Sequence, residues 1–69
     1  MILLIWDYND KVYTKMYTTD DIMSKKELKV NGRKANKVIL PKKEITPNMS
    51  KKLKRICAYN VVIVPIKDK

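Results

Sequence analysis

The chain has 69 residues and a formal net charge of +9, with one cysteine and no histidine. This length predicts a single small domain over residues 1–69, and the composition excludes an internal disulfide, a histidine-based zinc site and catalysis through a histidine base. Since no apolar run approaches the roughly 20 residues of a membrane-spanning helix, we expect a cytoplasmic protein without a membrane partner.

The first 17 residues predict a β-hairpin. The run Ile2–Trp6 is continuously apolar and too short for a helix, which favours a strand buried on both faces. Asp7–Asp10 is typical of a turn. The side chains of the next strand alternate between two faces. Val12, Thr14 and Met16 share one face, and the other face, which we expect to point outward, carries Lys11, Tyr13, Lys15 and Tyr17.

The segment after the hairpin predicts a short helix over residues 20–26. Two aspartates stand at its beginning and two lysines at its end, which suits the helix dipole. The alternative is a loop, because Ile22, Met23 and Leu28 do not recur at the spacing of an apolar helical stripe.

A second hairpin is predicted around Asn31-Gly32, a pair favoured in two-residue type I′ turns. Gly32 is the single glycine of the chain, which suits a position with positive φ. The turn separates residues 28–30 from the apolar run Val38–Leu40. We expect these two segments to pair.

The clearest helix begins at Thr46-Pro47, a threonine N-cap followed by proline at the first helical position. Apolar residues recur along one side of this helix, namely Met49, Leu53, Ile56 and Cys57. Cations occupy the opposite side and its flank, namely Lys51, Lys52, Lys54 and Arg55. We expect Asn60 to close the helix in the left-handed conformation.

The predicted fold is α+β, in the order ββ(α)ββαβ. Its small, mainly antiparallel sheet consists of two hairpins and a C-terminal strand, Val61–Val64, which Pro65 weakens or ends, with one main amphipathic helix on one face. The two fully apolar strands need cover on both faces, and one main helix covers only one. We therefore expect a homodimer that buries the uncovered face.

The residues that could carry catalysis do not form a recognisable group. Ser24 and Ser50 lack a histidine partner, and we expect Cys57 to be a buried, inert thiol. Four aspartates could gather around magnesium, but turn and capping roles account for them better: Asp7, Asp10, Asp20 and Asp21. We expect no catalytic residue, no metal and no cofactor, and hence a protein that is not an enzyme.

Basic side chains are concentrated in residues 22–55, which carry twelve of them against two acidic ones. Such a surface attracts nucleic acid or another polyanion. The candidate residues on the main helix, the loop before it and the second hairpin are Lys51, Lys52, Lys54, Arg55, Lys42, Lys43, Arg33, Lys34 and Lys37. A second candidate surface interleaves cations with rings on which bases could stack: Lys11, Tyr13, Lys15 and Tyr17. The alternatives are a solvated helix face and tyrosines that serve strand packing.

These observations predict a basic nucleic-acid-binding accessory protein of low sequence specificity, because lysines contact phosphates and only Arg33 and Arg55 could read guanine. The alternative is a small inhibitor or sequestering protein that binds an acidic protein surface or an anionic nucleotide. The compact size and low-GC amino-acid usage are similar to those of small phage proteins, which often act as such host-interaction factors.

Overall fold

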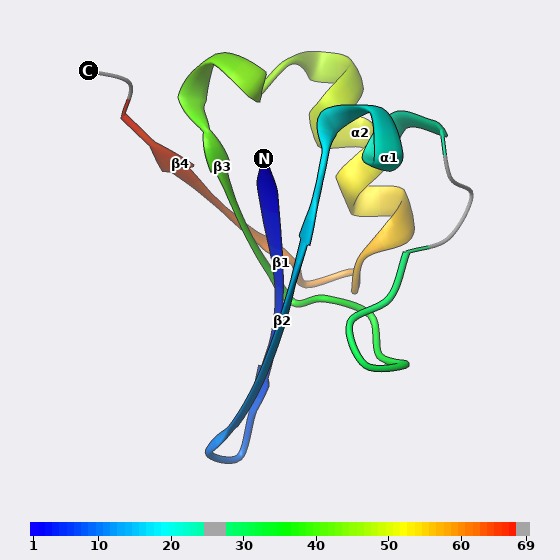
Figure 1. Ribbon diagram of the computed structural model, residues 1–69, viewed down its shortest axis with the longest axis vertical. Helices are drawn as coiled ribbons and strands as arrows, with labels where there is room; N and C mark the ends of the chain where they lie inside the picture. Colours follow the sequence, from blue (N-terminus) through cyan, green and yellow to red (C-terminus); the bar gives the residue numbers. More distant parts are fainter. Residues whose placement is uncertain (25–27, 68–69) are drawn as a thin grey trace.

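One four-stranded sheet organises the fold, with the strands in the order β2-β1-β3-β4 (Figure 1). The computed structural model describes residues 1–24 and 28–67. Its elements are β1 (Ile2–Tyr8), β2 (Lys11–Tyr17), α1 (Thr19–Ser24), β3 (Lys37–Pro41), the 3-10 helix η1 (Lys42–Glu44), α2 (Pro47–Ile56) and β4 (Val62–Ile66). β1 is antiparallel to β2 and β3, whereas β3 and β4 are parallel. The predicted α+β fold with a mainly antiparallel sheet is confirmed.

The first hairpin is longer than predicted. β1 and β2 pair along their whole length and leave Asn9 and Asp10 as a two-residue turn. Both residues have positive φ, 49° and 64°, as a type I′ turn requires. β1 continues beyond the predicted end because the side-chain amide of Asn36 holds the backbone of Asp7. The Asp7 N–H donates to Asn36 Oδ1 at 3.1 Å, and Asn36 Nδ2 donates to the Asp7 carbonyl at 2.8 Å.

The turn of the predicted second hairpin is confirmed, but the predicted pairing of residues 28–30 with Val38–Leu40 is wrong. Asn31 and Gly32 have φ of 50° and 77°. Val30 and Arg33 exchange two backbone hydrogen bonds of 2.8 and 3.0 Å, and the ladder ends at this bridge. β3 pairs instead with β1 and β4. An apolar strand buries more surface between two neighbours than at the end of an isolated hairpin.

α1 is the predicted short helix, and a reciprocal cap closes its first turn. The Asp21 N–H donates to Thr18 Oγ1 at 3.0 Å, and the Thr18 N–H donates to Asp21 Oδ2 at 3.2 Å. This arrangement satisfies two backbone donors that a helix start leaves without partners. The final two positions of the predicted range, residues 25 and 26, lie outside the described residues.

α2 begins as predicted and ends earlier. Thr46 Oγ1 accepts a hydrogen bond from the Met49 N–H at 3.1 Å, and proline occupies the first turn. The predicted closure by Asn60 is wrong. Cys57 ends the helix in an extended conformation, and the next N–H, that of Ala58, donates to the Ala35 carbonyl at 2.9 Å. This long-range bond draws the chain out of the helix before Asn60 is reached.

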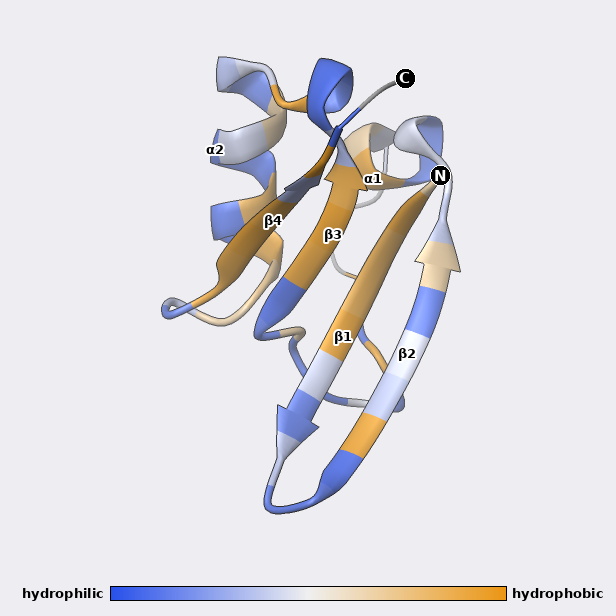
Figure 2. Ribbon diagram, turned by 90° about the vertical axis from the view of Figure 1, so that its left-hand side faces the viewer, coloured by the Kyte–Doolittle hydropathy of each residue, from blue (hydrophilic) through white to orange (hydrophobic). Residues whose placement is uncertain are grey.

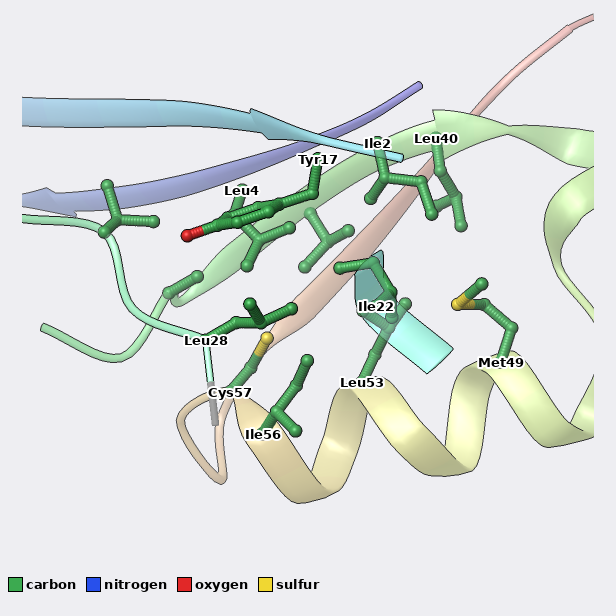
Figure 3. Packing of buried hydrophobic residues seen from close by; sticks show 13 residues of the cluster. Ile2, Leu4, Tyr17, Ile22, Leu28, Leu40, Met49, Leu53, Ile56 and Cys57 are labelled. Carbon is green, nitrogen blue, oxygen red and sulfur yellow. The ribbon is translucent and has the colours of Figure 1, made fainter. Parts of the chain in front are cut away.

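The core lies between one face of the sheet and both helices (Figure 3). Ile22 of α1 and Leu53 of α2 belong to the same buried cluster as Ile2, Leu4 and Leu40 of the sheet. The two helices therefore cover the same face.

The outward orientation predicted for the tyrosine face of β2 is wrong. Tyr17 is only 8% exposed, and its hydroxyl donates to the Lys29 carbonyl at 3.1 Å. Val12 and Met16, on the other face of β2, are more than half exposed. The cause is the pairing of Tyr17 with Ile2, which places both side chains on the helix-covered face. Alternation shows which residues share a face, but it does not show which face is covered.

No described helix covers the opposite face of the sheet, and β1, β3 and β4 are apolar along much of their length (Figure 2). The mismatch between apolar strands and available cover, predicted from the sequence, is therefore present in the fold. Within residues 1–24 and 28–67, no helix has the length and apolarity to span a membrane.

Candidate polyanion-binding surface

The outer side of α2 carries four cations, Lys51, Lys52, Lys54 and Arg55, which we call the cation face. The opposite stripe of the helix is buried against the sheet, so the cation face points to solvent. Lys52, on the flank, is half-buried, and the other three side chains are exposed. The structure thus places these residues as the helical spacing predicts.

The positive charge of the cation face is not compensated within the described part of the chain. α2 contains no acidic residue, and none of the four cations forms a hydrogen bond or an ion pair with another described residue. Lys54 and Arg55 lie in the last turn, where the helix dipole favours cations. Lys51 and Lys52 lie before the last turn, so the helix dipole does not offset their charge. The surface therefore keeps a positive potential that attracts anions.

A hollow runs along the flank of the cation face, between the two helices. Met23 of α1 lines it on one side, and α2 contributes Asn48, Lys51, Lys52 and Arg55. The α2 residues follow the spacing i, i+3, i+4 and i+7, so they form one line along the helix. Three positive groups and one amide can therefore reach an anionic group in the hollow, beside an apolar wall.

The 3-10 helix η1 precedes α2 in the chain and adds two exposed cations, Lys42 and Lys43. The Thr19 hydroxyl at the start of α1 donates a hydrogen bond to the carboxylate of Glu44 in η1. This contact ties α1 to the segment that leads into α2, and η1 lies at the amino-terminal end of α2 (Figure 1). Residues 42–55 hold six cations and one carboxylate, and that carboxylate is engaged by Thr19.

Arg33 belongs to a different part of the surface, where aromatic side chains hold it. Its guanidinium carbon lies 4.7 Å from the centroid of the Trp6 ring and 5.6 Å from that of Tyr13. These two rings stack, with centroids 5.5 Å apart and an interplanar angle of 25°, and Tyr8 lies 6.0 Å from Trp6. Cation–π contacts of this kind fix the turn around Asn31 against the first hairpin.

The remaining candidate residues are not gathered with the cation face. Lys34 is exposed beside Arg33, and Lys37 lies on the helix-free face of the sheet, paired with Ile5. On β2, Lys11 and Lys15 are exposed, but the tyrosines of that face do not form an accessible row of rings. Tyr13 is half-buried and Tyr17 is buried, so a base could stack on Tyr17 only if the core opened.

The acidic residues and the cysteine do not assemble a reactive centre in the described part of the chain. Asp7 and Asp10 lie at the tip of the first hairpin, and Asp20 and Asp21 lie in the first turn of α1. Among the described residues, no three histidine, cysteine, aspartate or glutamate side chains come close enough to hold a metal ion. Burial raises the pKa of the Cys57 thiol to about 11, so this group stays protonated at neutral pH.

Comparisons with protein-family models, with curated proteins and with solved structures found no match. The function must therefore be inferred from the surface itself. Helical spacing identified the cations of α2 from the sequence, but Asn48 and Met23 were missed. Asn48 lies on the same helical line as Lys51 and Lys52, so spacing could have found it. Met23 comes from another element, and only the packing of α1 beside α2 reveals it.

Proposed function

We propose that this protein is a non-enzymatic accessory protein that binds nucleic acid through the phosphate backbone, with low sequence specificity. The observation that carries the proposal is the cation face, four positive side chains on one helix that have no acidic partner among the described residues. The exposed Lys42 and Lys43 extend this charge to the start of α2. A positive surface of this kind neutralises phosphates and releases their counterions.

The low specificity follows from the side chains available. Lysine is a flexible point charge suited to phosphate, whereas arginine reads guanine with a planar fork. The chain has two arginines, and Arg33 is already stacked against Trp6 and Tyr13. Arg55 is the arginine that remains on the cation face. Contacts to phosphate position a protein on nucleic acid without selecting a sequence.

The proposal includes a cytoplasmic location, where a free thiol such as Cys57 persists in reduced form, and a homodimer as the binding form. The homodimer is supported by the apolar sheet face that no described helix covers.

The test measures the affinity for labelled duplex and single-stranded DNA by fluorescence anisotropy. If roughly six phosphates are contacted, raising the salt from about 50 to about 200 mM should weaken binding about 10³-fold. The triple variant Lys51→Glu, Lys54→Glu, Arg55→Glu should lose binding and keep its fold, because these side chains are exposed.

The matched control changes three exposed lysines outside α2, Lys11→Glu, Lys15→Glu and Lys67→Glu, and therefore alters the net charge equally. It should retain most of the affinity. Equal losses in the two triple variants, or an affinity that does not depend on salt, would overturn the assignment to the cation face.

A second candidate function is favoured by the hollow beside the cation face. Its three cations, the amide of Asn48 and the apolar side chain of Met23 suit a small anionic ligand such as a nucleotide. Calorimetry with ATP separates the two functions. Micromolar ATP binding without retention of DNA supports the sequestering function. If only millimolar ATP displaces bound DNA, nucleic acid is the ligand.

A further inference from the structure

The sheet face away from the helices, which we call the open face, carries mainly apolar side chains; Figure 2 shows the hydropathy of the strands. The strand register places these side chains on it: Leu3, Ile5, Val12, Thr14, Met16, Lys37, Ile39, Val62, Val64 and Ile66. Asp7 lies at the hairpin end of the same face. Val12 and Met16 at one edge, and Val62 and Ile66 at the other, are more than half exposed. Exposed apolar surface of this extent usually marks an interface.

The charge on the open face indicates what covers it. Lys37 is the single basic side chain in this set, although the chain carries 16 lysines and arginines. A nucleic acid or an acidic protein would gain little from this face, because its favourable contacts lie on the cation face. A second copy of the chain can approach it, because all but one of the basic side chains described on the strands and helices lie away from this face. An apolar face can also pack against a second copy of itself about a two-fold axis.

The edges of the sheet are less suited to association than the open face. β4 is an edge strand and contains Pro65, which has no N–H to donate to an added strand. β2, the other edge strand, carries Lys11 and Lys15, and charged side chains on an edge disfavour pairing with another chain. Association is therefore expected between faces.

We propose that two copies pack open face against open face as a symmetric dimer, with the helices on the two outer sides. Sheets packed in this way lie about 10 Å apart, with their strands at about 30° to each other. Four strands about 4.8 Å apart and about five residues long present roughly 300 to 400 Å² of sheet per copy. This area is small against the roughly 800 Å² per partner of a typical stable interface, so we expect a dimer that dissociates in the micromolar range.

This arrangement has a consequence that rests on the proposed function. In each copy the cation face lies on the side of α2 away from the sheet. Packing two open faces together therefore directs the two cation faces away from each other. Such a dimer does not form one longer groove along a single nucleic acid. It holds two separate segments, one on each side, and bridges them.

The dimer is tested by sedimentation equilibrium across the micromolar range. The variant Met16→Glu, Val62→Glu places acidic groups on the open face at exposed positions and should be monomeric. The matched control, Tyr59→Glu, Asn60→Glu, makes the same change in charge outside the strands, where Tyr59 is 99% exposed, and should dimerise like the parent protein. A monomeric parent, or a Met16→Glu, Val62→Glu variant that still dimerises, would overturn the interface.

Bridging is tested by immobilising one DNA duplex and measuring the capture of a second, fluorescent duplex. The parent protein and the Tyr59→Glu, Asn60→Glu control should capture it. The Met16→Glu, Val62→Glu variant should bind the immobilised duplex and capture at least tenfold less of the second one. A dimer that retains no DNA would refute the proposed function and leave the interface standing. A monomer that retains DNA would refute the interface alone.

Discussion

Burial decides the chemistry of Cys57, the residue at the end of α2. The side chain is 3% exposed and belongs to the core, and burial raises the pKa of its thiol to about 11. The thiolate is the reactive form of cysteine. A thiol that stays protonated at neutral pH holds little of this reactive form, and its buried side chain contributes packing to the core.

The raised pKa of Cys57 predicts a pH-dependent contribution to stability. In the unfolded chain the thiol ionises near its ordinary pKa of 9.0, and in the folded protein near 11, so folding favours the protonated form. Its contribution is complete below pH 9 and is lost as the pH rises towards 11. At about pH 10, one unit above the unfolded pKa, the loss is about 1 kcal/mol.

Urea unfolding of the parent protein and of Cys57→Ala at about pH 8 and about pH 10 measures this effect. The stability difference between them should shrink by about 1 kcal/mol at the higher pH. All other side chains are the same in the two proteins, so their contributions cancel in the comparison. A difference that stays constant with pH would show that the thiol is not protected in the folded state.

At the scale of the elements, α2 supports both the core and the cation face, and a single side chain caps it. Thr46 Oγ1 accepts from the Met49 N–H at 3.1 Å. Thr46→Ala should therefore lower the free energy of unfolding by about 1 kcal/mol. Thr46→Ser keeps the oxygen and should stay close to the parent protein in a thermal melt. Equal melting temperatures for the alanine and serine variants would contradict the cap.

Elements defined by local chemistry could be predicted from the sequence. The helix start at Thr46-Pro47, the turn at Asn31-Gly32 and the alternation of β2 each depend on neighbouring residues, and each is confirmed. The cations of α2 follow from the same local spacing. Their position on the side of the helix away from the core could therefore be predicted.

Features that depend on residues distant in the sequence could not be predicted. The early end of α2 results from the bond between Ala58 and Ala35. The buried orientation of Tyr17 depends on which face the helices cover. The contact between Arg33 and the Trp6 ring forms only when the turn at Asn31-Gly32 folds back onto the first hairpin. Neither propensity nor periodicity contains such information.

At the scale of the whole molecule, charged and apolar surfaces are separated. The helices and their cations lie on one side of the sheet, and the open face lies on the other (Figure 2). This separation is what would allow the dimer that we propose for a chain of net charge +9. Salt should therefore have two opposite effects. It screens the repulsion among the cations, and it weakens the attraction of the cation face for phosphate.

The free protein should therefore become more stable as sodium chloride is added, while its affinity for nucleic acid falls. The molecule measures 32 × 28 × 19 Å, so at about 0.01 M salt, where the Debye length is about 30 Å, charges across the whole molecule interact, and the excess of cations makes the net interaction repulsive. At about 0.15 M the Debye length is about 8 Å and most of this repulsion is screened. We expect a gain of about 1 kcal/mol, or about 4 to 8 °C in melting temperature.

Calorimetric melts of the parent protein and of Lys51→Gln, Lys54→Gln, Arg55→Gln at the two salt concentrations test this expectation. The triple variant lowers the net charge from +9 to +6 and removes three neighbouring cations, so its melting temperature should rise less with salt. Glutamine keeps the helix and most of the side-chain length, which separates the effect of charge from that of packing. A melting temperature that falls with salt in the parent protein would mean that ion pairs, and not repulsion among uncompensated cations, dominate its electrostatics. The net repulsion that we attribute to the uncompensated cations of the cation face would then be contradicted.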